Sequence, residues 1–158
     1  PRLLEAAGAD VVLVVPSVAD LGDREIDREL RHLGDPAYDA WLKERLADLD
    51  ATLRSHSSRV IWATSPHVRL EPRDGDGDWT QVDANDPARV DRLNELIHEV
   101  VGPRDGGTII DLDAWAHGLP RGGEFGADHR ADGSDFTAVG ADTVAAWLVP
   151  ELADAQDG

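Results

Sequence analysis

Residues 8–17, GADVVLVVPS, form the stretch that decides the fold. A continuous run of apolar, mostly β-branched residues lies between a glycine and a proline, without alternation of apolar and polar positions. This pattern is typical of a strand buried on both faces, and such strands belong to parallel sheets covered by helices on each side. Residues 59–64 (RVIWAT) and 107–113 (GTIIDLD) repeat the pattern, so we predict three parallel strands.

Helical segments separate and follow these strands. Two of them begin at the pairs Asp35-Pro36 and Asp86-Pro87, which predict an aspartate N-cap followed by proline at the first helical position. A third helix is expected over residues 138–152, and Pro150 should end or bend it, leaving 154–158 as a polar tail. The apolar residues expected to face the core are Tyr38, Leu42, Leu46, Leu49, Leu53, Val90, Leu93, Ile97, Val101, Val144, Trp147 and Leu148.

The order of these elements predicts an α/β fold, a three-layer sandwich around a parallel sheet, with residues 1–153 forming one domain. Three strands are few for such a sheet. Val11 to Val15 would lie along an unpaired edge, which proteins usually avoid. We therefore expect further strands before Pro1 in a parent protein, or a partner that covers this edge.

The composition excludes several classes of function. The chain has 158 residues, 41% of them hydrophobic, so a sizeable core is expected. A net charge of −17 disfavours nucleic acid and anionic lipid as partners. Cysteine is absent from the sequence, which excludes disulfides, zinc-thiolate sites and a cysteine nucleophile.

Ligands of parallel α/β sheets bind beyond the carboxyl ends of the strands. Loops 16–20, 65–67 and the segment from 111 onwards follow the three predicted strands and should meet there. The loop 129–137, just before the last helix, is expected to return to the same rim.

Residues 129–141, HRADGSDFTAVGA, resemble the closing block of the SGNH (GDSL-like) hydrolases, which has the form Asp-x-x-His. Here the block is Asp132-x-x-Asp135. The resemblance is closest to SGNH domains attached to acyltransferase-3-type membrane acyltransferases of actinobacteria. The segments that carry it, in the family's order, are 9–15 with 21–25, 62–68, 78–97, 108–115 and 130–152.

This resemblance implies a flavodoxin-like SGNH fold, incomplete at its N-terminus, and cleavage or transfer of acyl esters on cell-envelope carbohydrate. It also implies a secreted or extracytoplasmic location, association with a membrane acyltransferase domain of the same parent protein, and no cofactor. In the family, the aspartate orients a histidine that activates a serine. Two departures weaken catalysis: the Gly-Asp-Ser block is missing, and Asp135 occupies the position of the histidine. A carboxylate is a far weaker base than imidazole at neutral pH.

The candidate catalytic residues are therefore Asp132 and Asp135. The alternative for Asp132 is a turn residue, since Asp-Gly pairs are common in turns, and for Asp135 it is the N-cap of the last helix. The candidate substrate-binding residues are Ser17, His67, Trp79 and His129. His129 is also consistent with a solvated loop residue, and Trp79 with a platform for stacking a sugar. We expect surface positions for His32, His56, His98 and His117.

Two further functions stay open from the sequence. One is a pseudoenzyme that binds a glycan or an acylated partner without turnover. The other is an acidic interaction module that binds calcium at residues 74–78, where carboxylates alternate with glycines. Trp79 and Asn85 occupy positions where a calcium loop needs glycine and glutamate, so a solvated acidic loop is favoured and no metal site is expected.

Overall fold

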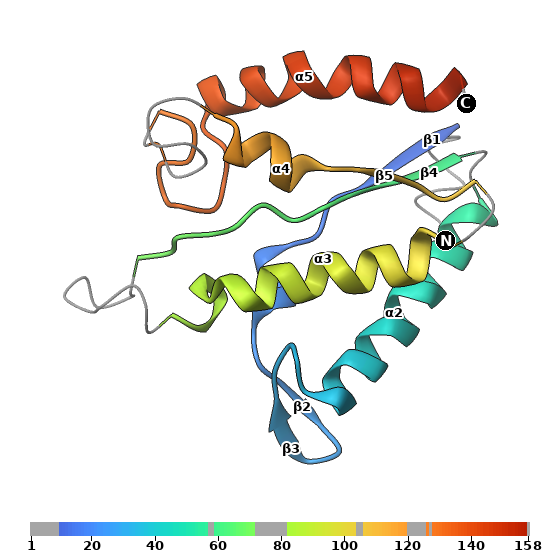
Figure 1. The fold of residues 1–158 in the computed structure, drawn as a ribbon, viewed down its shortest axis with the longest axis vertical. Helices are drawn as coiled ribbons and strands as arrows, with labels where there is room; N and C mark the ends of the chain where they lie inside the picture. The colour runs from blue at the N-terminus through green and yellow to red at the C-terminus, as the bar shows by residue number, and fades with distance from the viewer. Residues whose placement is uncertain are drawn as a thin grey trace.

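The protein is built around a parallel sheet of three strands in the order β1-β4-β5 (Figure 1). The computed structural model describes residues 10–56, 59–71, 82–103, 106–119, 126 and 128–157. The strands are β1 (Val11–Val14), β4 (Arg59–Ala63) and β5 (Thr108–Ile110). Val12 aligns with Val60, and Ile61 aligns with Thr108. The prediction of three parallel strands is confirmed, with shorter strands than the sequence pattern suggested.

Helices flank the sheet on both sides (Figure 1). α2 (Pro36–Arg54) and α3 (Pro87–Val101) lie on one side, while α4 (Leu112–His117) and α5 (Ala138–Asp157) lie on the other. This arrangement confirms the α/β class with a parallel sheet flanked by helices. None of the helices in the described part of the chain has the length and apolar character needed to cross a membrane.

The main core lies between the sheet and the pair α2 and α3. β4 is the central strand, and its residues Val60 to Ala63 are buried. The predicted stripe of α3 is confirmed, because each of its residues is at most 1% exposed: Val90, Leu93, Ile97 and Val101. In α2 the stripe is confirmed at Tyr38, Leu42, Leu46 and Leu53.

The prediction for Leu49 is wrong, because this side chain is 42% exposed. It lines a cavity of about 280 Å³ between α2 and the end of β1. The adjacent Asp50 is fully buried instead. Its carboxylate accepts hydrogen bonds from the indole Nε1 of Trp62 and from Nε of Arg54, both at 2.9 Å. A buried carboxylate needs such partners, and one of them, Trp62, comes from strand β4, which the helix pattern does not contain.

The last helix differs from the prediction in two ways. It continues through Pro150 to Asp157, so residues 154–157 are helical rather than a tail. Proline removes a helix hydrogen bond to the carbonyl of Ala146, but both residues are exposed and water can take that bond. The residues expected in the core are only half-buried: Val144, Trp147 and Leu148.

Trp147 stacks on Trp115 of α4, with ring centroids 5.0 Å apart and an angle of 17° between the planes. The guanidinium of Arg59 also donates a hydrogen bond to the carbonyl of Ala155, which joins α5 to β4. α5 is therefore held to the rest of the protein by its α4 contact and its ends.

A small antiparallel hairpin, β2 (Arg24–Ile26) and β3 (Glu29–Arg31), was not predicted from the sequence. Its turn residues Asp27 and Arg28 have positive φ values of 54° and 67°. Two-residue hairpin turns favour Asn-Gly or Asp-Gly pairs, so an Asp-Arg turn carries no strong local signal. Also missed were α4 and two short 3₁₀ helices, η1 (Val18–Leu21) and η3 (Asp83–Asn85).

Substitution of Asp86 by alanine should lower the free energy of unfolding by about 1 kcal/mol, because its carboxylate accepts a hydrogen bond from the amide of Ala88 at the start of α3. Asp35 is the matched control. It precedes α2 and its proline in the same way, but its side chain makes no capping bond to the helix. Urea unfolding followed by circular dichroism should show a smaller loss for Asp35→Ala, and equal losses would contradict this assignment.

Candidate functional site

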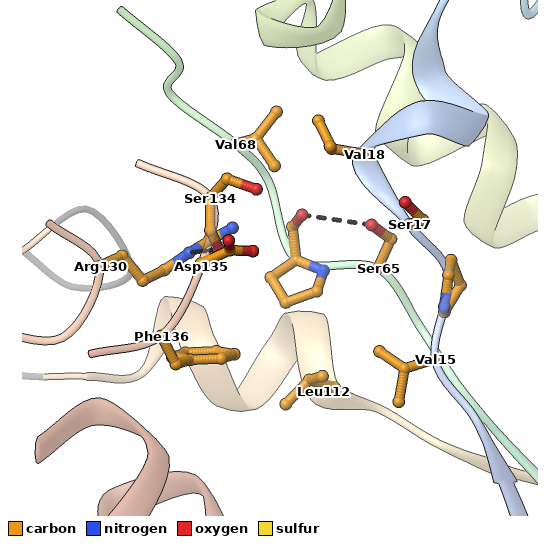
Figure 2. A pocket seen from close by; sticks show the side chains of 12 residues that line it. Val15, Ser17, Val18, Ser65, Val68, Leu112, Arg130, Ser134, Asp135 and Phe136 are labelled. Atoms are coloured by element: carbon orange, nitrogen blue, oxygen red, sulfur yellow. Dashed lines mark hydrogen bonds between the residues drawn. The ribbon is translucent and has the colours of Figure 1, made fainter. Parts of the chain in front are cut away.

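A cavity of about 190 Å³ lies beyond the carboxyl ends of the three strands (Figure 2). Each segment expected at this rim contributes to its wall: Ser17 follows β1, Ser65 follows β4, Leu112 follows β5, and Arg130 and Asp135 come from the loop before α5. The predicted meeting of these four segments is therefore confirmed. The sheet topology brings them together, because parallel strands end at the same edge.

Ser17 lines the cavity and also caps η1. Its Oγ accepts a hydrogen bond from the amide of Ala19 at 3.2 Å, and the Asp20 carboxylate accepts one from the amide of Ser17 at 3.0 Å. This reciprocal pair is a capping box. It fixes the serine at the mouth of the cavity, with its hydroxyl proton still available to a ligand oxygen.

Ser65 is held through its backbone by the side chain of Asn94 on α3. Oδ1 of Asn94 accepts from the Ser65 amide at 2.7 Å, and Nδ2 donates to the Ser65 carbonyl at 3.0 Å. The Ser65 hydroxyl donates to the carbonyl of Pro66 at 3.4 Å, a bond drawn in Figure 2. α3 thereby sets the floor of the cavity, a role for Asn94 that the sequence analysis missed.

Arg130 organises the loop before α5 and is only 4% exposed. Its Nε donates to the carbonyl of Ser134 at 2.7 Å, and its Nη1 donates to the carbonyl of His67. The guanidinium also lies 5.4 Å from the ring centroid of Phe136, within cation–π range. Arg130 thus links the closing loop to the segment after β4. This link was not predicted, because His67 lies 63 residues from Arg130 along the chain.

The structure places Asp132 in a tight turn. Its Oδ1 accepts hydrogen bonds from the amides of Ser134 at 2.8 Å and Asp135 at 2.7 Å. These two backbone bonds favour the ionised form and hold the pKa of the Asp132 carboxyl below its usual range. These hydrogen bonds support the interpretation of Asp132 as a turn residue. A catalytic role for Asp132 remains a prediction.

Asp135 lines the cavity in an exposed position, and the alternative role as N-cap of the last helix is wrong. α5 begins at Ala138, and the hydroxyl of Thr137 accepts from the amide of Gly140 at 3.0 Å. The same hydroxyl donates to the carbonyl of Asp128. Since Thr137 provides the cap, the Asp135 carboxylate is available at the cavity wall.

The other candidate residues are placed differently. His129 is half-buried, its side chain does not line the cavity, and its carbonyl accepts from the amide of Thr137 at 2.7 Å. Trp79 and the candidate calcium loop 74–78 lie outside the described residues.

His67 lies beside the cavity, one residue beyond Pro66, which lines it. Its ring contacts two side chains, His117 of α4 and Asp91 of α3. A third side chain, Asp113, lies close to both histidines, and burial raises the pKa of its carboxyl. His117, expected only as a surface residue, is exposed but belongs to this cluster. The spacing of Asp113 and His117, one helical turn apart, was the available signal.

No protein-family model, curated protein or solved structure matches this chain. The geometry of the cavity and its loops must therefore carry the functional argument.

Proposed function

We propose that this chain is the substrate-binding part of an SGNH-type ester hydrolase or O-acyltransferase domain that acts on acylated carbohydrate outside the membrane. The observation that supports the proposal best is the cavity at the carboxyl ends of all three parallel strands, with the loop 130–136 as one wall. The resemblance of residues 129–141 to the closing SGNH block assigns that loop to the same place.

The composition of the cavity suits a small acyl group. Apolar side chains of Val15, Val68, Leu112 and Phe136 form part of the wall, and hydroxyls of Ser17 and Ser134 form another part. The volume of about 190 Å³ is below that of typical drug-sized pockets. An acetyl or similarly short ester fits this mixture, with its methyl group on the apolar wall and its oxygens toward the hydroxyls.

Turnover by these residues alone should be weak. Among the described residues that line the cavity, none is a histidine, and Asp135 is the carboxylate at the family's base position. A serine hydroxyl needs a base to become a good nucleophile. Both ring nitrogens of the neighbouring His67 are directed to other side chains. We therefore propose that the main role of this cavity is to bind substrate, and that its contribution to catalysis is small.

The binding proposal can be tested by calorimetry with an O-acetylated oligosaccharide and its deacetylated form. We expect the acetylated ligand to bind at least about 10-fold more tightly, because only it fills the apolar wall. Val15→Trp should abolish binding by filling the cavity, since Val15 lines it and is 51% exposed, so the protein should still fold. Val149→Trp is the control, at 63% exposure on α5. Equal binding of the acetylated ligand by both variants would exclude this cavity as its binding site.

Hydrolysis of an activated acetyl ester should stay near the background rate for the native chain. Asp135→His should raise that rate at least about 10-fold, because imidazole supplies a base with a pKa near neutrality. High native activity that is lost in Asp132→Ala would show that Asp135 does not disable the site. No activity in either protein would leave saccharide binding as the function of the cavity.

A further inference from the structure

Four side chains beside the cavity form what we call the His67 cluster: His67, Asp91, Asp113 and His117. They come from three segments of the chain. His67 lies on the loop that follows β4, Asp91 lies on α3, and the other two lie on α4. Within the cluster, one donor atom each of His67, Asp113 and His117 lies within 4.8 Å of the other two.

The two imidazole rings face each other through single nitrogen atoms. Nδ1 of His67 lies 3.2 Å from Nε2 of His117, and the rings are inclined at 78°. The other nitrogen of each ring has an oxygen partner. Nε2 of His67 is 3.1 Å from the Asp91 carboxylate, and Nδ1 of His117 is 3.0 Å from the backbone carbonyl of Asp113.

These oxygen partners determine the tautomers. A carboxylate and a carbonyl only accept hydrogen bonds, so the outer nitrogen of each ring must carry the hydrogen. In neutral rings the two inner nitrogens, Nδ1 of His67 and Nε2 of His117, then direct lone pairs at each other. Two lone pairs at this distance repel unless a positive centre, either a proton or a metal ion, lies between them.

The third side chain favours a metal ion. Oδ1 of Asp113 is a buried oxygen that makes no hydrogen bond among the described residues, although it lies 3.3 Å from Nδ1 of His117. A proton shared between the histidines joins only the two rings, whereas a cation can bind a carboxylate and both imidazoles together. Nitrogens bound at about 2.0–2.1 Å to a tetrahedral zinc ion lie roughly 3.3 Å apart, close to the separation found here.

We propose that the His67 cluster binds one Zn²⁺ ion through His67 Nδ1, His117 Nε2 and the Asp113 carboxylate. The Asp91 carboxylate then accepts a hydrogen bond from the outer nitrogen of His67. This carboxylate–histidine arrangement commonly orients zinc ligands. The His67 side chain is 17% exposed and that of His117 is 49% exposed, so an ion can enter from solvent. Three protein ligands leave a fourth position for water or a ligand oxygen.

The site also adjoins the proposed acyl-binding cavity. His67 directly follows Pro66, and Asp113 directly follows Leu112, and both of these neighbours line that cavity. Arg130 binds the carbonyl of His67 and so connects the two sites. The zinc site does not depend on the proposed ester ligand, since only side chains of the His67 cluster form it.

The test is calorimetric titration of the chelator-treated full chain with zinc chloride, paired with thermal unfolding. We expect one high-affinity site per chain and a rise in Tm with zinc, because the ion binds the folded form. His117→Gln should weaken binding at least about 100-fold, and Asp91→Asn about 10-fold to 100-fold, as for other residues behind a metal ligand. Titration with cobalt(II) should give the intense visible absorption of a tetrahedral site.

His32→Gln is the matched control, since His32 is an exposed histidine on a different segment, before α2. It should bind zinc like the native protein. Equal zinc binding by the native chain and His117→Gln would overturn the proposal, because zinc would then bind to carboxylates outside the His67 cluster. No zinc binding by the native chain would also overturn it, and a proton shared by the two rings would replace the metal.

Discussion

Substitution of Gly133 by alanine should lower the free energy of unfolding by roughly 3 kcal/mol or more. Gly133 has a φ of +74°, and a Cβ atom there would lie 1.8 Å from the carbonyl oxygen of Arg69 and 2.5 Å from its carbon. The clash is with backbone, so no side-chain rotation relieves it. The amide of Arg69 donates to the carbonyl of Gly133 at 2.9 Å, and this contact would have to break.

The matched control is Gly34→Ala. Gly34 also has a positive φ, +96°, but a Cβ there meets no atom within 4 Å. The loss of free energy of unfolding in Gly34→Ala should be limited to about 1–2 kcal/mol, the cost of placing a Cβ atom in the left-handed conformation. Chemical unfolding monitored by circular dichroism measures both variants. Similar losses would show that backbone conformation alone matters and that the loop can move away from Arg69. Gly133→Ala should also lose the binding of an acetylated saccharide, since the loop carries Asp135.

The second large effect concerns Asp50, whose replacement by alanine should cost about 3 kcal/mol. The variant leaves the Trp62 indole N–H buried without its acceptor, and it removes the carboxylate that pairs with Arg54. Asp50→Asn keeps a neutral acceptor for the indole and should lose about half as much.

Asp48→Ala is the control for this experiment. Asp48 lies on the same helix with a side chain that is 73% exposed, and it pairs with Arg45 at 3.9 Å. An exposed pair of this kind contributes little, so the loss should stay within about 0.5 kcal/mol. A loss for Asp50→Ala as small as that for Asp48→Ala would mean that water replaces the buried carboxylate.

The features that were predictable depend on residues close in sequence. The buried runs gave the three parallel strands, and the helical spacing of Val90, Leu93, Ile97 and Val101 gave the buried face of α3. The rule that ligands bind at the carboxyl ends of parallel strands correctly placed the three loops that follow strands at the cavity, and the separate expectation for the loop before α5 was also met.

The features that were missed depend on contacts between distant segments. Leu49 was expected in the core, but it is exposed, and the adjacent Asp50 is buried against the indole of Trp62. The alternative role of Asp135 as the cap of α5 came from a local signal, an aspartate before a helix, yet the Thr137 hydroxyl provides the cap. His117 meets His67 because α4 lies against the segment that follows β4, where the amide of Asp113 donates to the hydroxyl of Thr64, so no spacing in the sequence relates the two.

The pairing of the sheet also has a consequence for how fast the chain folds. Val11 pairs with Arg59, and Ile61 pairs with Thr108, so each strand pair forms only after an intervening helix and its loops have been closed. Closing long loops costs entropy before the strand contacts return any free energy. The cavity is lined by residues that follow all three strands and by the loop before α5, so we expect it to be complete only after both strand pairs have formed. We therefore expect ligand binding to appear only in the last stage of folding.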